Sequence, residues 1–216
     1  MFLWKLIKLA ILIAGGYLLG NFSTGIVVSK LFADFDIRTK GSGNTGATNM
    51  LRTLGWVPSL LTFAGDALKG VLACLLGSAL LGMPGAYIAG LACVAGHNWP
   101  ALFGFRGGKG VATSFGVLLF TCPVIAISVL ILQIAIVALT KTMSIASICS
   151  GLLNAVLSLF LLHRTPFFMV CGFVITALLL FQHRENIIRL LGNRENKLDF
   201  SRINRIKAHL HRKGGK

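Results

Sequence analysis

The sequence predicts an all-α integral membrane protein, a bundle of about seven transmembrane helices. Of its 216 residues, 55% are hydrophobic and only 12% are charged, and the mean hydropathy is +0.80. Several apolar runs reach the roughly 20 residues that an α-helix needs to cross a bilayer. Since the apolar runs fill almost the whole chain, we expect one membrane domain over residues 1–200 and a basic cytoplasmic tail over 201–216.

Six apolar segments define the expected helices. They cover residues 6–28, 56–81, 85–103, 111–139, 144–162 and 166–182. The second and third are separated by an expected turn at Met83, Pro84 and Gly85. The fourth carries Pro123 near its middle, and splitting it there restores the parity of membrane crossings that the basic gaps require. The count then becomes about seven, although the piece before Pro123 is too short to cross the core by itself.

The net charge of +15 is concentrated in the gaps between apolar segments and in the last thirty or so residues. By the positive-inside rule, the gaps that hold Arg52 and Lys109 and the basic tail face the cytoplasm. The N-terminus is then outside and the C-terminus inside. This distribution does not predict a nucleic-acid partner, whereas a basic membrane edge attracts anionic lipids and phosphorylated substrates.

Few reactive side chains lie inside the apolar segments. The five cysteines form no CxxC pair, so we expect small buried hydrophobic residues rather than a metal site or disulfides. Asp66 and Lys69 are three residues apart and can pair on one helix face. They are either functional intramembrane groups or a structural ion pair turned toward the bundle.

The polar stretch 41–55, GSGNTGATNMLRTLG, is the first candidate site. Its first nine residues include no large apolar side chain, and three glycines allow turns that point backbone N–H groups at one spot. Such a loop can bind an anion, and a cation lies beside it. The expected phosphate-binding residues are Ser42, Gly43, Asn44, Thr45, Gly46, Ala47, Thr48, Asn49 and Arg52. The alternative is an ordinary polar connector between two membrane helices.

The second candidate site is the stretch 96–113, GHNWPALFGFRGGKGVAT. Glycines surround Lys109 just before a helix, where exposed amides and the helix dipole favour phosphate. It is not a Walker A loop, because Phe103 occupies the place of the first glycine. The expected binding residues are His97, Gly107, Gly108, Lys109 and Gly110. A helix-entry turn without a ligand is the alternative.

The third candidate site begins at His183, after the last apolar segment, and runs to residue 197. In a helix, His183 and Asn186 share one face, and His183 is the group most suited to titrate near neutral pH. The alternative is an interfacial anchor. All three stretches converge by topology on one membrane face, as a lipid enzyme that joins an apolar chain to a phosphorylated head group requires.

The three stretches resemble, in order, the three motifs of the PlsY family, the acyl-phosphate:glycerol-3-phosphate acyltransferases of bacterial membranes. The third motif is HRENIIRLL, followed two residues later by RENK. Trp99 and Arg106 depart from the usual residues, as does the pair Gly192-Asn193, and the polar patch 21–25 is atypical. Because Asn tolerates left-handed geometry, we expect the turn at Asn193 to be kept.

The resemblance implies that an acyl group passes from acyl phosphate to the 1-hydroxyl of sn-glycerol 3-phosphate, giving lysophosphatidate and phosphate without metal or cofactor. This would be the first step of phospholipid synthesis, at the cytoplasmic face of the bacterial inner membrane, with a soluble acyl-phosphate synthase as a possible partner. Ser42, Arg52, Lys109, His183 and Asn186 are the expected catalytic residues, while Glu195 braces the third motif. The base is either His183 or the oxygens of the acyl phosphate.

Two rival functions remain. An acyl-CoA-dependent acyltransferase commonly has a His followed five residues later by Asp, and none of the five histidines here has that Asp. An organic-phosphate transporter would have ionisable groups near mid-membrane and an internal repeat. Only Asp66 and Lys69 meet the first demand, and no repeat is apparent.

Overall fold

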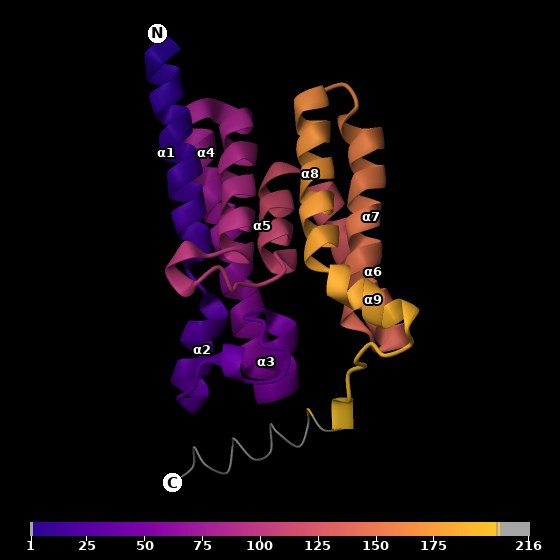
Figure 1. Cartoon of the computed structure of the whole chain (residues 1–216). Coiled ribbons are helices and arrows are strands. Elements are labelled where there is room, and N and C mark those ends of the chain that lie inside the picture. Colours follow the sequence, from indigo (N-terminus) through magenta and orange to yellow (C-terminus); the bar gives the residue numbers. More distant parts are fainter. Residues whose placement is uncertain (1, 202, 204–216) are drawn as a thin grey trace.

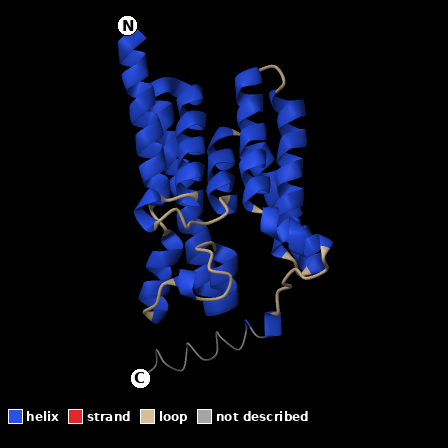
Figure 2. Cartoon of the chain, viewed as in Figure 1, coloured by secondary structure: helices blue, strands red, loops and turns tan. Residues whose placement is uncertain are grey.

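The computed structural model describes residues 2–201 and residue 203, and all regular elements in that part of the chain are helices (Figure 2). This confirms the all-α prediction. Of the expected tail 201–216, all but Ser201 and Ile203 lie outside the described residues. The helices are α1 (Phe2–Asn21), α2 (Thr24–Ala33), α3 (Ala47–Leu54), α4 (Trp56–Asn98), α5 (Val111–Thr121), α6 (Pro123–Thr140), α7 (Met143–Leu162), α8 (Pro166–Gln182) and α9 (Arg184–Leu191), with short 3-10 helices η1 (Ile37–Thr39) and η2 (Ala101–Phe103).

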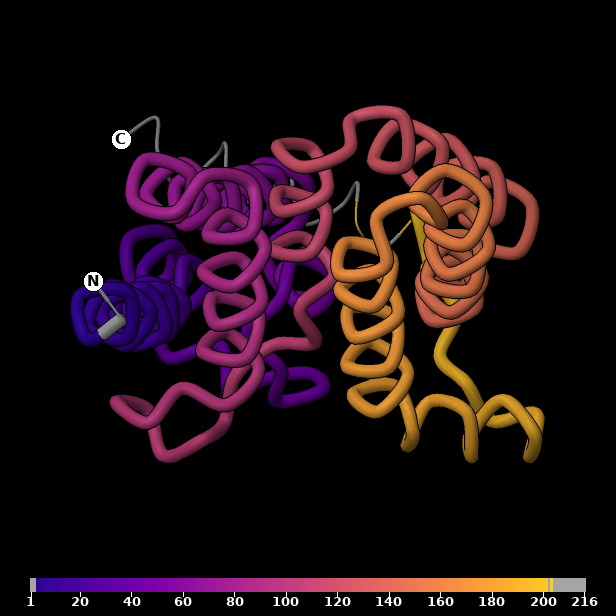
Figure 3. Tube along the Cα trace, turned by 90° about the horizontal axis from the view of Figure 1, so that it is seen from above, coloured from indigo at the N-terminus to yellow at the C-terminus, as the bar shows by residue number. Residues whose placement is uncertain are grey.

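The long helices run side by side, while α2, α3 and α9 gather at one end of the bundle (Figure 1). The N-terminus of α1 lies at the opposite end. Seen from above, α1, α4 and α5 form one group and α6, α7 and α8 another, with α5 adjoining α6 (Figure 3). The three polar stretches therefore come together near the same end of the bundle, as the parity argument expects.

The helix α4 is a hairpin of two antiparallel arms. Its backbone leaves helical geometry at Leu81 (φ −137°) and Gly82 (φ +64°), so the second and third apolar segments are confirmed as separate arms. The turn lies just before the residues 83–85 at which it was expected, so that placement was wrong. Pro84 falls instead in the first turn of the second arm, where its missing N–H breaks no helical hydrogen bond.

The other helix breaks follow polar and proline residues. The apolar segment 111–139 is divided at Cys122, and Pro123 is the first residue of α6, as predicted. The first segment was wrong in its extent, because α1 ends at Asn21 and α2 begins at Thr24. Ser23 caps the new helix, its hydroxyl accepting the N–H of Ile26 at 3.5 Å.

Several helices are suited to a bilayer. Within the described residues, four segments are long and apolar enough to span a membrane: Leu3–Ala33, Trp56–Phe103, Pro123–Thr140 and Met143–Leu162. The helices α8 and α9, bent by 58° at their junction, would make a fifth if the two together were one span. The predicted count of seven crossings and the predicted orientation stay predictions.

Candidate active site

The first polar stretch is a loop organised around the side chain of Asn49. Its Nδ2 donates to the carbonyl oxygens of Asn44 (2.8 Å), Lys40 (3.0 Å) and Ile37 (3.3 Å), and its Oδ1 accepts the N–H of Ser42 at 3.0 Å. Asn49 is only 2% exposed, so it shapes the loop from within. Among the predicted binding residues, Asn49 and Thr45 are therefore buried.

Some of the amides expected to bind phosphate are used inside the loop. The N–H of Gly43 donates to the Lys40 carbonyl at 3.0 Å, and that of Gly46 donates to the Asn44 side chain at 2.8 Å. The exposed side chain of Ser42 lies on the outside of the loop. The stretch therefore has fewer free backbone amides for an anion than the sequence suggested.

Arg52 projects from α3 toward the third polar stretch. Its Nη2 donates to the backbone oxygen of Asn196 at 2.9 Å, and burial lowers the pKa of its guanidinium. A desolvated cation that keeps its charge interacts strongly with an incoming anion. The structure thus links the first and third stretches through Arg52.

The second polar stretch folds back on the end of α4. The N–H of Gly108 donates to the carbonyl of His97 at 3.0 Å, and a Cβ at Gly108 would clash with the imidazole ring of His97. Gly110, in the left-handed region with φ +76°, is the N-cap of α5. Only glycine fits both positions, which explains the glycines that flank Lys109.

Lys109 begins a chain of polar contacts that runs into the third stretch. Its ammonium donates to Oδ1 of Asn186, and Nδ2 of Asn186 donates to Oε1 of Glu195 at 2.8 Å. The other oxygen of Glu195 pairs with Nε of Arg189 at 2.8 Å. Burial opposes ionisation of Glu195, but the hydrogen bonds from Asn186 and Arg189 lower its pKa. The expected bracing role of Glu195 agrees with this geometry.

The pKa of Lys109 lies well below the ordinary value for a lysine side chain. The pKa of Lys109 is lowered to about 8, mainly by burial and next by the positive charge of Arg189. The charge of Arg52 lowers it further, whereas the charge of Glu195 raises it. Charges from the first and third polar stretches therefore act on an amine of the second, which supports the predicted convergence of the three. A bound phosphate would stabilise the protonated amine and raise its pKa again.

His183 lies at the bend between α8 and α9, 3% exposed. Its Nδ1 is 2.8 Å from the Leu179 carbonyl oxygen, which can only accept, so Nδ1 carries the proton. The pKa of His183 is lowered to about 4, mainly by burial and to a smaller extent by the charge of Lys109. At neutral pH the ring is neutral, with a lone pair on Nε2 that can accept a proton.

A polar cleft of about 270 Å³ opens between the three stretches. Its walls include Asn44 of the first, Gly107, Gly108 and Lys109 of the second, and three residues that follow α8 or end it: Gln182, Arg184 and Glu185. Ser42, Arg52, His183 and Asn186 are not among its lining residues, although Asn186 contacts Lys109 directly. Its polar lining, which includes the cation Lys109, is suited to an anionic group.

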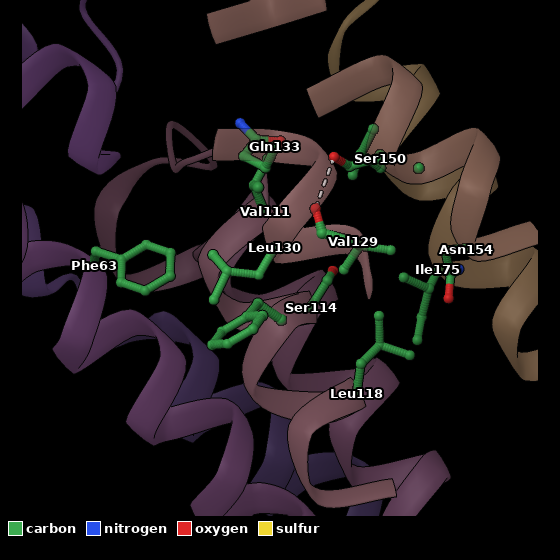
Figure 4. Close-up of a pocket in the computed structure, with 13 residues that line it drawn as sticks. Phe63, Val111, Ser114, Leu118, Val129, Leu130, Gln133, Ser150, Asn154 and Ile175 are labelled. Carbon is green, nitrogen blue, oxygen red and sulfur yellow. Dashed lines mark hydrogen bonds between the residues drawn. The ribbon is translucent and has the colours of Figure 1, made fainter. Parts of the chain in front are cut away.

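A narrow apolar cavity of about 50 Å³ lies deeper, between α5, α6, α7 and α8 (Figure 4). Side chains such as Leu118, Val129 and Ile175 line it, and Phe63 of α4 closes one side. Leu179 also lines it, and the carbonyl of the same residue holds His183. The apolar cavity therefore adjoins the polar site.

The structure also settles the geometry of Asp66 and Lys69. They form an ion pair of 3.0 Å with both side chains at most 3% exposed, so the predicted pairing on one helix face is confirmed. Nδ1 of His97 is 2.8 Å from the Lys69 ammonium. His97, predicted to bind phosphate, thus lies in a buried cluster behind Gly108.

Sequence reasoning missed the contacts that tie the loops to each other. Arg38 is held by Asp36 at 2.7 Å and donates to the carbonyl of Phe103 at 2.8 Å, joining the first and second stretches. Gln182 donates to the carbonyl of Gly108 at 3.2 Å. The acidic-basic pair at 36 and 38 was a signal, but nothing in the sequence indicated its distant acceptor.

Comparison with known proteins agrees with this site. Residues 10–193 match the family model described as "Glycerol-3-phosphate acyltransferase". The chain is 43% identical over 188 residues to the glycerol-3-phosphate acyltransferase of Alkaliphilus metalliredigens, which covers 87% of this chain and 95% of the relative. With that of Clostridioides difficile it shares 44% identity over 188 residues, covering 84% and 91%.

A solved structure has the same fold. The crystal structure of PlsY, an integral membrane glycerol 3-phosphate acyltransferase, in its glycerol 3-phosphate form superposes with a TM-score of 0.82 at 37% identity. The match covers 88% of this chain and 96% of that one. The lysophosphatidic acid form gives a TM-score of 0.80 at 36% identity.

Proposed function

We propose, since the chain belongs to the glycerol-3-phosphate acyltransferase family, that it transfers an acyl group from acyl phosphate to the 1-hydroxyl of sn-glycerol 3-phosphate. The chain is an integral membrane acyltransferase. What is proposed beyond this is the donor, the products lysophosphatidate and phosphate, and the roles of individual residues.

One observation carries the proposal: a cationic polar cleft, into which three loops contribute, lies next to an apolar cavity between helices. An acyl phosphate has a fatty chain and a phosphate, and glycerol 3-phosphate is a second small phosphate ester. The apolar cavity suits part of the chain, and the cations that line the cleft, Arg106, Lys109 and Arg184, suit the phosphates. The reactive carbonyl would then lie between the two regions, near His183.

The reaction needs little chemistry from the protein. The glycerol 1-hydroxyl oxygen bonds to the acyl carbon, the bond from that carbon to the phosphate oxygen breaks, and inorganic phosphate leaves. The hydroxyl proton passes to Nε2 of His183 or to an oxygen of the departing phosphate. The main tasks of the site are to align two anions and to stabilise the charge that develops on the leaving group.

The contacts support separate roles for the side chains, with each phosphate bound by a different group of residues. Lys109, fixed by Asn186, is positioned to bind one phosphate in the cleft, together with the backbone of Gly107 and Gly108. Arg52 and Ser42 would bind the other phosphate from the side of the first loop. A nucleophilic role for Ser42 is not favoured, because the described residues place no hydrogen-bonded base beside its hydroxyl.

We further propose that the cleft faces the cytoplasm of the bacterial inner membrane. The basic residues in the gaps around α2, α3 and α9 support this sidedness by the positive-inside rule. Soluble glycerol 3-phosphate would then enter from the cytoplasm, and the product could leave sideways into the bilayer. A soluble synthase that delivers the acyl phosphate could dock on the same face.

The test is a donor-dependence assay on protein purified in detergent. Labelled glycerol 3-phosphate is incubated with palmitoyl phosphate or with palmitoyl-CoA, and labelled lysophosphatidate is measured. We expect product only with palmitoyl phosphate and a loss of at least about 100-fold in Lys109→Ala, while Lys5→Ala, an exposed lysine near the N-terminus at the opposite end of the bundle, serves as the matched control. Product only with palmitoyl-CoA would establish the rival donor, and no product with either would refute the proposal.

A further inference from the structure

Lys69 is a buried lysine that the reaction itself does not use. It is 3% exposed, on the first arm of α4, and its ammonium lies within hydrogen-bond distance of four acceptors. They are Oδ1 of Asp66 (3.0 Å), Nδ1 of His97 (2.8 Å) and the carbonyl oxygens of Gly20 (3.1 Å) and Phe22 (2.8 Å). An ammonium has three N–H donors, so all of them are directed at protein atoms and none is left for a substrate.

Two of these acceptors belong to the break between α1 and α2. The last carbonyls of a helix have no partner within it, and a cation at that end is favourable. The break lies directly behind the first loop, because a Cβ at Gly25, in the first turn of α2, would clash with the carbonyl oxygen of Thr45. Lys69 therefore fixes the element on which the first loop rests.

A further acceptor of the Lys69 ammonium, Nδ1 of His97, connects Lys69 to the second loop. Since an ammonium can only donate, Nδ1 of His97 accepts from Lys69, and the proton of the neutral ring is on Nε2. The ring packs against Gly108, whose N–H donates to the His97 carbonyl at 3.0 Å. Gly108 directly precedes Lys109. The orientation of the His97 ring therefore fixes the position of the glycine loop that carries Lys109.

We propose that Lys69 is a positioning residue that fixes the spacing between the two phosphate-binding loops, acting through the α1–α2 break on one side and through His97 on the other. The inference rests on the proposed function, since it assigns one phosphate to each loop. It also gives a purpose to the polar patch 21–25, which has no role in the motifs: Asn21 accepts the N–H of Leu102 at 3.1 Å and so ties the break to the second loop as well.

The kinetic test separates positioning from simple stability. Lys69→Met alone would strand the Asp66 carboxylate, so it is combined with Asp66→Asn, and Asp66→Asn alone is the matched control that keeps the ammonium. Because a misplacement of about 1 Å can cost about 100-fold, we expect the double variant to lower kcat/KM about 10- to 100-fold for both substrates. The control should stay within about threefold of the wild type.

A role in stability alone would lower the melting temperature and leave kcat/KM of the folded enzyme unchanged for both substrates, which would overturn the proposal. A change confined to one substrate would overturn it too, because the coupling is to both loops. Rescue in Lys69→Arg with Asp66 kept, to within tenfold of the wild type, supports a requirement for the cation at this place.

A distance measurement makes the test independent of turnover and of folding yield. Spin labels are attached at the exposed Lys40→Cys and Arg106→Cys positions, with Cys122 and Cys149 replaced by alanine, in protein reconstituted into lipid nanodiscs. We expect a broader distance distribution in the Lys69→Met/Asp66→Asn background than with Asp66→Asn alone. An unchanged distribution would refute the inference even if no donor supported turnover, whereas a broadened one without turnover would refute only the proposed function.

Discussion

The substitution Glu195→Gln tests the polar chain that holds Lys109. Glu195 accepts two hydrogen bonds of 2.8 Å, from Asn186 and from Arg189, and its side chain is 6% exposed. A glutamine at this position offers one acceptor oxygen, so one of the two bonds is lost. If Asn186 turned its amide in response, its Nδ2 would face the ammonium of Lys109, donor against donor.

The magnitude follows from the surroundings of each bond. Arg189 is 37% exposed, so its ion pair is screened and contributes at most about 1 kcal/mol. The bond from the buried Asn186 to a carboxylate is stronger, about 1.5–3 kcal/mol. A net loss of about 1–2 kcal/mol corresponds to a decrease of about 5- to 30-fold in kcat/KM for glycerol 3-phosphate.

The pH dependence gives the sharper result. The proposed role of Lys109 in phosphate binding requires its protonated form. Its pKa is lowered to about 8, so the wild-type kcat/KM should fall as the pH rises through about 8. The negative charge of Glu195 raises the pKa of Lys109. Removing it lowers that pKa further, so the alkaline limb of Glu195→Gln should move to lower pH.

The assay measures kcat/KM for glycerol 3-phosphate between pH 6 and 9.5 at a saturating concentration of acyl phosphate. Asp34→Asn is the matched control, because it removes an exposed carboxylate at the same end of the bundle and asparagine accepts its left-handed backbone (φ 53°). An alkaline limb that stays in place, or moves to higher pH, would refute the coupling between Glu195 and Lys109.

Three further substitutions test other parts of the site. Asn49→Ala removes four hydrogen bonds, and we expect a melting-temperature decrease equivalent to about 2–4 kcal/mol together with a raised KM, measured by thermal unfolding and kinetics. Gly108→Ala pushes the second loop off the ring of His97, and the rate should fall at least about tenfold with little loss of melting temperature. Ser114→Leu narrows the apolar cavity, so the ratio of rates with palmitoyl and shorter acyl phosphates should fall, whereas Ala177→Leu on an exposed face of α8 leaves that ratio unchanged.

Sequence patterns that depend on composition predicted the fold well. Runs of apolar residues gave the helices, and Pro123 gave the break between α5 and α6, because both depend on local chemistry. The left-handed backbone expected at Asn193 is also confirmed, with φ 52°. The end of α1 was missed for two reasons. A single serine is a weak sequence signal for a helix cap, and the N–H that Asn21 accepts comes from Leu102, which is far away in the sequence.

The convergence of the three polar stretches was more predictable than the arrangement of side chains within them. Lys109 and Asn186 were both named, and the structure brings them into contact. The division between side chains that face the cleft and those that support it was not predictable. Asn49 and His97 are polar residues within motifs, as Lys109 is, yet both are buried and support the loops. Burial of a polar side chain depends on which segment covers it, and single-sequence patterns do not hold that information.

The apolar cavity and the polar cleft come within one turn of each other along α8, because Leu179 lines the cavity and Gln182 lines the cleft. The side chain of Leu179 lines the cavity, while its carbonyl oxygen accepts from Nδ1 of His183 and so directs Nε2 away from the helix. The Lys109 ammonium affects the titration of the same imidazole. In the proposed mode of binding, the acyl phosphate has part of its chain in the cavity and its phosphate near Lys109, which brings its carbonyl close to His183. The attacking hydroxyl of glycerol 3-phosphate would then meet a neutral imidazole, the protonation state required to accept its proton.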